Sequence, residues 1–334
     1  MIMDAVDVPA RPGRVSVLFG QQVNQLEPVV EYARVCEARG MRLWLGQSLM
    51  IETHAALAAV AGRGISIETG LSVAVAPLRS PVDAFTQARS VAKLMGRPIA
   101  AGYGMGSAKV AGQLLGREFT APAHYMASYV EQIKALKQDP SNFNPDDDGP
   151  ATGEHAIEVG CGVLRPRMTR EAGRVADFVV SWLTPRDYLA STLLDALDTG
   201  AAAAGRARPR VVSIVQCALA GADRNPVRLA SMGCGQHIRL PHYANMLQKA
   251  GIDITGSPAS DLRAALRTGL FAYGSAHEIA AIVNSYFRVG VDEVVLNVGS
   301  VGLEHGNAAA LNDVEEILEA VGQIRTEQLT STER

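Results

Sequence analysis

The sequence has few charged residues and no region where one sign of charge dominates. Asp, Glu, Lys and Arg make up 19% of the 334 residues, against about 25% in an average soluble domain. The net charge is −3 and no stripe of Lys and Arg is present, so a nucleic-acid partner is not expected. No apolar run reaches the roughly 18 residues of a membrane-spanning helix. With 48% hydrophobic residues, the composition predicts a globular chain with a large core.

Cysteine is scarce and scattered. Cys36, Cys161, Cys217 and Cys234 include no C-x-x-C pair, so we expect buried thiols in a cytoplasmic protein. No set of histidines and carboxylates has metal-ligand spacing, and no metal is expected. The acidic run within residues 139–153 is typical of a solvated loop.

The two ends of the chain lack the patterns of the middle. Residues 1–13 mix acidic, basic and proline residues without the apolar segment of a signal peptide. We therefore expect a flexible N-terminal tail over 1–13, a single domain over 14–325 and a loose C-terminal tail over 326–334.

Short apolar strands alternate with segments of helical periodicity along the rest of the chain. Strands are predicted at 14–19, 41–45, 65–75, 99–102, 157–159, 178–182, 210–219 and 291–298, and helices at 26–39, 52–61, 81–94, 122–137, 185–204, 276–289 and 313–325. Apolar strands that each precede a helix indicate a parallel sheet buried on both faces. Eight such units predict a closed (β/α)8 TIM barrel of the α/β class.

A doubly wound sheet is the alternative fold. It favours a G-x-G-x-x-G turn after the first strand, and the sequence there is Gly20-Gln21-Gln22. Two segments are longer than one crossover needs, 139–153 and the mostly helical 226–269. In a barrel we expect such insertions at the C-terminal mouth, where the active sites of these folds lie.

The turn after the fifth strand has the features of a phosphate site. Gly160 and Gly162 interrupt a β-branched strand, and the turn that follows carries Arg165 and Arg167 before a helix begins. Backbone N–H groups at a helix start, together with arginines, hold anions. The segment therefore predicts a phosphorylated cofactor, although a surface role for either arginine remains open.

Several short motifs in a fixed order resemble one known family. The matching segments are LWLGQ at 43–47, GLSVAVAPLRSP at 70–81, GYG at 102–104, LG at 115–116, PAHYMASY at 122–129, PRM at 166–168, AGRVAD at 172–177 and WLT at 182–184. With this set, the chain resembles the luciferase-like monooxygenase superfamily of barrels. Within it, the chain is similar to the actinobacterial oxidoreductases that use the deazaflavin coenzyme F420.

The resemblance implies a set of cofactor-binding residues at the C-terminal strand ends. A backbone bulge on the third strand, in which relatives often hold a non-proline cis peptide, would press against the ring. The implied ring contacts are Phe19, Gly20, Gln47, Leu71, Ser72, Val73, Gly102, Tyr103 and Gly104, and the implied phosphate contacts are Gly162, Val163, Leu164, Arg165 and Met168.

The proton donor is the least defined part of the implied site. Many relatives carry an acidic residue or a histidine after the second strand, where this chain has Gln47, which cannot titrate. Gln47 is predicted to contact the ligand, with a structural amide as the alternative. Tyr103, Tyr125 or a histidine of the 226–269 insertion then remain as candidate donors, and Trp182 either lines the pocket or belongs to the core.

His237, His242 and Tyr243 are the insertion's candidates for that donor, and surface positions are their alternative. The implied function is hydride transfer from C5 of reduced F420 to an unsaturated small-molecule or peptide natural-product intermediate. An FMN-dependent monooxygenase using O₂ and an inactive cofactor-binding barrel are the alternatives. A basic rim at the mouth favours F420, whose tail is acidic. Relatives are often dimers, so a homodimer is also implied.

Overall fold

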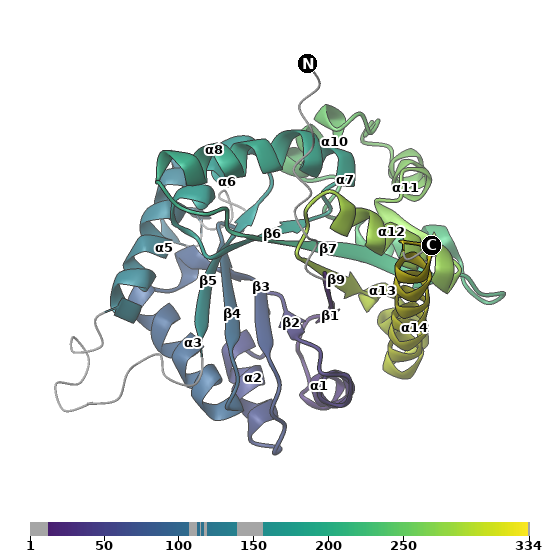
Figure 1. The fold of residues 1–334 in the computed structure, drawn as a ribbon, viewed down its shortest axis with the longest axis horizontal. Helices are drawn as coiled ribbons and strands as arrows, with labels where there is room; N and C mark the ends of the chain where they lie inside the picture. The colour runs from purple at the N-terminus through teal and green to yellow at the C-terminus, as the bar shows by residue number, and fades with distance from the viewer. Residues whose placement is uncertain (1–12, 107–111, 114, 117–118, 139–155, 333–334) are drawn as a thin grey trace.

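One closed parallel barrel organises the chain, as predicted (Figure 1). The computed structural model describes residues 13–106, 112–113, 115–116, 119–138 and 156–332. Hydrogen bonding runs from β1 through β2, β3, β4, β5, β6 and β7 to β9, which pairs again with β1. The strands are β1 Arg14–Phe19, β2 Leu43–Leu45, β3 Thr69–Val75, β4 Ile99–Gly104, β5 Ile157–Val163, β6 Phe178–Trp182, β7 Arg210–Leu219, β8 Phe271–Gly274 and β9 Glu293–Asn297.

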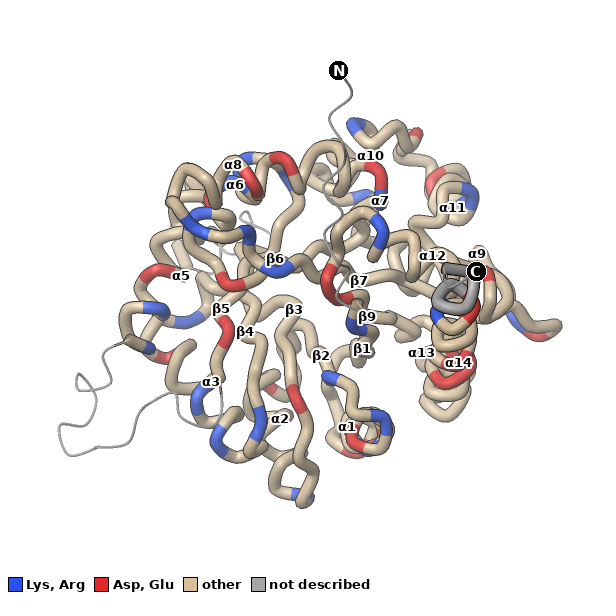
Figure 2. Tube along the Cα trace, in the orientation of Figure 1, with Lys and Arg blue, Asp and Glu red and all other residues tan. Residues whose placement is uncertain are grey.

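Helices cover the outside of this barrel (Figure 1). They are α1 Glu27–Arg39, α2 Thr53–Ala61, η1 Ala76–Leu78, α3 Pro81–Met95, α5 Pro122–Gln138, α6 Pro166–Val175, α7 Arg186–Tyr188, η3 Leu189–Leu193, α8 Leu194–Ala203, α9 Pro226–Gly233, α10 Pro241–Lys249, α11 Pro258–Arg267, α12 Ala276–Arg288, α13 Gly299–His305 and α14 Asn307–Thr332. Among the described residues, no helix is both long enough and apolar enough to cross a bilayer. Positive and negative residues are interspersed over the helical layer, so no single sign dominates it (Figure 2).

Local sequence signals fixed several helix ends as predicted. Gly40 ends α1 in the left-handed conformation at φ 62°, where its N–H meets the last free carbonyls. Pro81 begins α3 behind Ser80, whose hydroxyl accepts from the Asp83 N–H. Ser275 and Glu278 form a capping box at the start of α12.

The structure differs from the predicted elements in the C-terminal half of the chain. The short strand β8 was missed, and it pairs with the end of β7 from Gln216 to Leu219. Because β7 has ten residues, it extends past β6 and offers a free edge there. The last helix begins at Asn307 and continues to Thr332, so residues 326–332 are helical and not loose. Residues 1–12 of the tail predicted over 1–13, and the insertion at 139–153, lie outside the described residues.

The barrel interior is a separate apolar core. Trp44 and Phe178 fill its centre with their rings 5.8 Å apart and tilted by 72°. Glycines opposite them leave the room: a Cβ on Gly70 would meet Trp44 at 2.4 Å, and one on Gly160 would meet Phe178 at 2.3 Å. The remaining buried members of this core are Leu18, Ala100, Val180, Val212, Ile214 and Val295. Apolar packing therefore closes the barrel below its C-terminal mouth.

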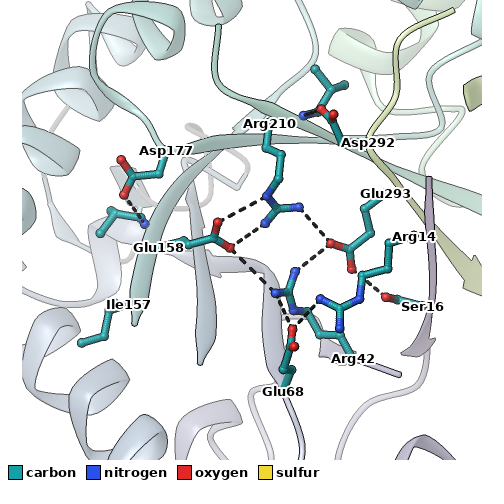
Figure 3. A network of polar contacts seen from close by, with 12 residues as sticks. Arg14, Ser16, Arg42, Glu68, Ile157, Glu158, Asp177, Arg210, Asp292 and Glu293 are labelled. Atoms are coloured by element: carbon teal, nitrogen blue, oxygen red, sulfur yellow. Dashed lines mark hydrogen bonds and ion pairs between the residues drawn. The ribbon is translucent and has the colours of Figure 1, made fainter. Parts of the chain in front are cut away.

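Charged residues close the other end of the barrel (Figure 3). Glu293 is fully buried at the start of β9. It accepts from Arg42 at 2.7 Å, from Arg210 at 2.9 Å and from the Trp44 indole at 2.8 Å. Arg42 also binds Glu68 at 2.8 Å, and Arg210 binds Glu158 at 2.6 Å. The buried charges are thereby paired with opposite charges, as burial requires.

Candidate functional site

Small residues line the C-terminal end of the barrel interior. Side chains alternate between the two faces of a strand, so Gly20 follows Leu18 on the inside of β1, and Gly46 follows Trp44 at the end of β2. Gly104 and Gly162 occupy the same level on β4 and β5. These glycines lie above the layer of Trp44 and Phe178, with Asn297 against Gly20 and Val73 against Gly104 and Gly162. We call this end of the barrel interior the dish.

The bulge of β3 forms one side of this dish. The Ser72–Val73 peptide is cis, as the resemblance implied, and the register to β4 shifts between Leu71 and Ala74. Val73 consequently projects into the interior, next to the apolar core. A Cβ on Gly104 would lie 2.6 Å from Val73 Cγ2, and one on Gly162 would lie 3.0 Å from Val73 Cγ1. The dish thus depends on those two glycines.

Other residues of the implied ring site have different surroundings. Phe19 is buried on the outside of β1, edge-on to Tyr32 of α1 at 5.2 Å. Leu71 is fully buried in the same outer core, between barrel and helices. Gly102 is packed against backbone, because a Cβ there would meet the Leu71 carbonyl oxygen at 2.3 Å. These residues position the strands and do not present side chains to a ligand.

The side-chain amide of Gln47 forms hydrogen bonds to other residues of the protein. Its Oε1 accepts from the Val75 N–H at 2.9 Å and from Arg79 Nη2 at 3.2 Å, and its Nε2 donates to the Ser48 carbonyl at 2.8 Å. The amide therefore holds the end of β3 beside the loop after β2. This geometry matches the structural alternative, in which Gln47 is a positioning residue, and its predicted contact with a ligand stays a prediction.

The role of proton donor predicted for Tyr103 does not agree with its position. Between the inward-facing Gly102 and Gly104, its side chain points outward, is fully buried and donates to the Ala84 carbonyl of α3 at 3.0 Å. Burial also raises the pKa of its hydroxyl. Tyr125 lies farther out on α5, with its ring packed against Phe119 at 5.2 Å and Tyr129 at 6.1 Å. The structure therefore groups neither tyrosine with Val73.

The turn between β5 and α6 is shorter than predicted, because β5 continues through Gly160 and Gly162 to Val163 and Arg167 already lies in the first turn of α6. Arg165 is extended at φ −136°, and the helix starts at Pro166, with the first helical bond from Thr169 N–H to the Arg165 carbonyl. Arg165 and Arg167 are exposed. Val163 is buried in the outer core, and Leu164 and Met168 pack against it. Only the arginines and the turn backbone are consequently open to an anion.

Four rings gather above the end of β6. Trp182 ends that strand inside the barrel, 5.5 Å from the ring of His237. Tyr243 lies 5.9 Å from His237 and 4.8 Å from His242. The 226–269 insertion thus folds back over the mouth and brings its polar rings to the barrel. Among the described residues, the Trp182 indole N–H has no partner.

Electrostatics set the protonation of these rings. Desolvation lowers the pKa of His237. Desolvation, the positive charge of Arg165 and that of His237 together lower the pKa of His242. Burial raises the pKa of the Tyr243 hydroxyl, which therefore stays protonated near neutral pH. The charge of Arg165 acts on His242, which brings the start of α6 near the insertion.

Two buried amides at the mouth escaped the sequence analysis. Gln216 continues the inward-facing series of Val212 and Ile214 on β7, is 1% exposed, and has no hydrogen-bond partner for either amide atom within the described chain. Asn297 reaches across Gly20, where a Cβ would meet its Oδ1 at 2.1 Å. The available signal was a polar residue inside an otherwise apolar strand.

A family model shows to which protein family the chain belongs. The model described as luciferase-like monooxygenase matches residues 10–293, which is most of the chain. The chain belongs to the luciferase-like monooxygenase family. A search of curated protein sequences finds no match. The barrel, the cis peptide and the open mouth are therefore features of a chain in this family.

Solved structures with the same fold cover nearly the whole barrel. One is the coenzyme F420-dependent tetrahydromethanopterin reductase of Methanopyrus kandleri, with a TM-score of 0.63, 16% identity, and 88% of this chain and 99% of that chain covered. Another is an F420-dependent secondary alcohol dehydrogenase in complex with an F420–acetone adduct, with a TM-score of 0.63, 13% identity, and 91% of this chain and 99% of that chain covered. A third is the oxygenating constituent of 3,6-diketocamphane monooxygenase from Pseudomonas putida, in complex with FMN. Its TM-score is 0.63 and its identity 16%, and the match covers 85% of this chain and 91% of that chain. At these identities the likeness shows the fold alone.

The residues at the mouth suit a planar cofactor with an anionic tail. At Gly104 and Gly162, β4 and β5 present no side chain to the interior, and Val73 lies against both glycines. The unpartnered amide of Gln216 and the indole N–H of Trp182 offer hydrogen bonds to a polar ring edge. The start of α6 offers backbone N–H groups and arginines to a phosphate.

Proposed function

We propose that the protein is an oxidoreductase that uses coenzyme F420 to transfer a hydride to an unsaturated small molecule or peptide intermediate. The observation that carries this proposal is the basic rim beside the dish. Arg165 precedes α6 and its charge acts on His242, Arg167 lies in the first turn of α6, and Arg239 follows His237 by two residues in the insertion. None of the three forms an ion pair with a carboxylate among the described residues, and Arg239 Nε donates to the Gly235 carbonyl at 2.9 Å. An acidic cofactor tail, longer than a single phosphate, would pair with them.

The residues of the dish support the same proposal, because they could contact the ring of the cofactor. A tricyclic ring laid on Gly104 and Gly162 would contact Val73 on one edge and Trp182 on another. Gln216 would hydrogen-bond its polar edge, because its buried amide has no partner among the described residues. When bound in reduced form, such a cofactor supplies a hydride. The contribution of the chain is to orient the reactants and exclude water.

The polar rings above the mouth are placed to handle a proton. Tyr243 remains protonated because burial raises its pKa, so it can donate a hydrogen bond or a proton to a substrate atom. His242, 4.8 Å away between ring centroids, is largely neutral near pH 7 because its pKa is lowered. A neutral imidazole can pass a proton from solvent to the tyrosine oxygen. We therefore assign proton delivery to Tyr243, with His242 as its supply.

A second candidate function is an FMN-dependent monooxygenase. One observation favours it: a neighbour of the same fold is described in complex with FMN. FMN would use the same dish and the same turn at α6, but its phosphate would leave part of the basic rim unpaired. On the resemblance we also propose a homodimer.

Equilibrium binding of the purified protein to F420 and to FMN, followed by fluorescence at moderate salt, separates the candidates. The proposal expects F420 to bind more tightly, with an affinity that falls as salt rises because the rim is basic. Tighter binding of FMN would favour the monooxygenase. If neither cofactor binds, the assignment of the dish is wrong, while the barrel itself is unaffected.

A further inference from the structure

A second pocket lies outside the barrel, between the segment that follows β3 and helix α5. It has a volume of about 430 Å³, within the range of small-molecule sites. Residues from Pro77 to Pro81 form one wall, and Tyr125, Ser128, Tyr129 and Gln132 of α5 form the other. None of the residues assigned above to the ring or to the basic rim belongs to it.

Arg79 is held in this pocket with one nitrogen unused. Its side chain is 6% exposed, and Nη2 contacts Gln47 Oε1 at 3.2 Å and Glu52 Oε1 at 3.3 Å. Burial raises the pKa of Glu52, but the hydrogen bond with His54 and the charge of Arg79 outweigh this and lower it to about 2, so Glu52 stays ionised. Arg79 Nη1 is buried and has no partner within the described residues. A guanidinium can only donate, so this nitrogen needs an acceptor.

Tyr129 provides a second unused donor. It is 2% exposed, and its hydroxyl also has no partner within the part of the chain described. Its ring is fixed by Tyr103 at 5.5 Å and Tyr125 at 6.1 Å. Burial raises the pKa of this hydroxyl while the charge of Arg79 opposes the rise, which indicates that the two side chains are near each other. The hydroxyl therefore stays protonated and available to donate.

The rest of the pocket wall is apolar and partly aromatic. Pro77 and Pro81 contribute rigid rings, Leu78 contributes an aliphatic side chain, and Tyr125 contributes an aromatic face. Such surfaces bind a flat apolar body, while a few polar groups fix its orientation. Two buried donors without partners in the described residues, one of them positively charged, favour an anionic oxygen at the polar end.

We infer that this pocket binds a small aromatic carboxylate, with a carboxylate oxygen accepting from Arg79 Nη1 and Tyr129 Oη. The ring of the ligand lies against the prolines and Tyr125. The site does not depend on the identity of the cofactor at the mouth. It is nevertheless connected to the mouth, because Gln47 Oε1 accepts both from Arg79 and from the Val75 N–H at the end of β3.

Titration of the whole protein with fluorobenzoate, observed by fluorine NMR, tests the inference. We expect saturable binding that persists when F420 or FMN is present. Tyr129→Phe removes a hydroxyl that has no partner among the described residues, so it should leave the fold intact and weaken binding about fivefold to tenfold. Tyr103→Phe is the matched control. Its hydroxyl donates to Ala84 outside the pocket, so binding should be unchanged.

Uncharged fluorobenzyl alcohol should bind at least about tenfold more weakly than fluorobenzoate, because it lacks the charge that Arg79 recognises. Equal affinities of the wild type and Tyr129→Phe for fluorobenzoate would overturn the inference. Displacement of fluorobenzoate by the cofactor would also overturn it, since binding would then be at the mouth. So would the absence of saturation up to about 10 mM.

Discussion

Val73 occupies the space that a side chain on Gly104 would need: a Cβ built there lies 2.6 Å from Val73 Cγ2. Because the obstacle is a side chain, Gly104→Ala should fold but push Val73 into the dish. We expect cofactor affinity to fall at least about tenfold in fluorescence titrations, with partial recovery in Gly104→Ala/Val73→Ala. Gly102→Ala is the contrast, since its Cβ would meet the Leu71 carbonyl oxygen at 2.3 Å and should lower the free energy of unfolding. Unchanged cofactor affinity in Gly104→Ala would contradict the dish.

Gln47 should matter for the position of β3 and not for proton transfer. Gln47→Leu leaves the Val75 N–H without its acceptor, which costs about 1 to 3 kcal/mol of the free energy of unfolding, less where water reaches it. Gln22→Leu is the control, because within the described residues the Gln22 side chain accepts from the exposed Leu49 N–H at 3.2 Å and donates to the Gln47 carbonyl at a long 3.5 Å. Urea denaturation measures both. A Gln47→Leu variant as stable as the wild type, with turnover abolished, would instead point to a catalytic amide.

Substitution of Tyr243 should lower kcat, whereas substitution of Tyr103 should not. Tyr243→Phe removes the protonated hydroxyl above the mouth, and general-acid contributions predict a loss of kcat of about a hundredfold or more. Tyr103→Phe removes only the bond to Ala84, so kcat should be retained and about 1 kcal/mol of stability lost. Steady-state rates with reduced F420 and a substrate found by screening test the pair. Equal losses of kcat would mean that Tyr243 acts only through packing.

His242 should report the arrival of an anion at the turn. Its pKa is lowered by desolvation, Arg165 and His237, so the imidazole gains a proton only below its ordinary value of about 6.5. A bound anion favours the imidazolium and should raise the pKa of His242, and activity that depends on the neutral ring should then fall as the pH drops. Proton NMR titration with and without inorganic phosphate follows this, with His277 as the reference histidine. A pKa of His242 that phosphate leaves unchanged would argue against an anion site there.

Arg165 should serve the cofactor more than the fold. It is exposed at the start of α6, so Arg165→Ala should leave the free energy of unfolding within about 0.5 kcal/mol. Loss of a charge-assisted contact should weaken F420 binding about tenfold. Arg174→Ala, on the last turn of the same helix and paired with Glu171, controls for helix effects. Equal F420 affinity in both variants would remove Arg165 from the phosphate site.

Glu293 should be the main electrostatic contributor to stability at the closed end. Glu293→Gln keeps an acceptor for Trp44 but leaves Arg42 and Arg210 facing each other without their shared carboxylate. Breaking a buried pair costs about 3 to 5 kcal/mol. The exposed pair of Arg39 with Glu315 is the control, and Glu315→Gln should cost under about 1 kcal/mol. Chemical denaturation distinguishes them, and similar midpoints would show that the network is adaptable.

Periodicity along the chain determined the fold, because each strand and helix buries one set of side chains and local signals such as Gly40, Pro81 and Ser275 set their ends. The short strand β8 escaped because its four residues pair only with the overhang of β7, which depends on how far β6 extends. The order of motifs determined the family and the bulge of β3.

Only the tertiary structure decided which way each strand residue faces and what it meets. Tyr103 and Gly104 are neighbours in the chain, yet one donates to a helix outside the barrel and the other forms the dish inside. Gln47 is committed to Val75 and Arg79 by contacts 28 and 32 residues away in sequence. The grouping of His237 and Tyr243 with Trp182 likewise depends on the path of a long insertion. The sequence determines which residue types are present at these positions. Which residues they contact is determined by long-range packing in the folded chain.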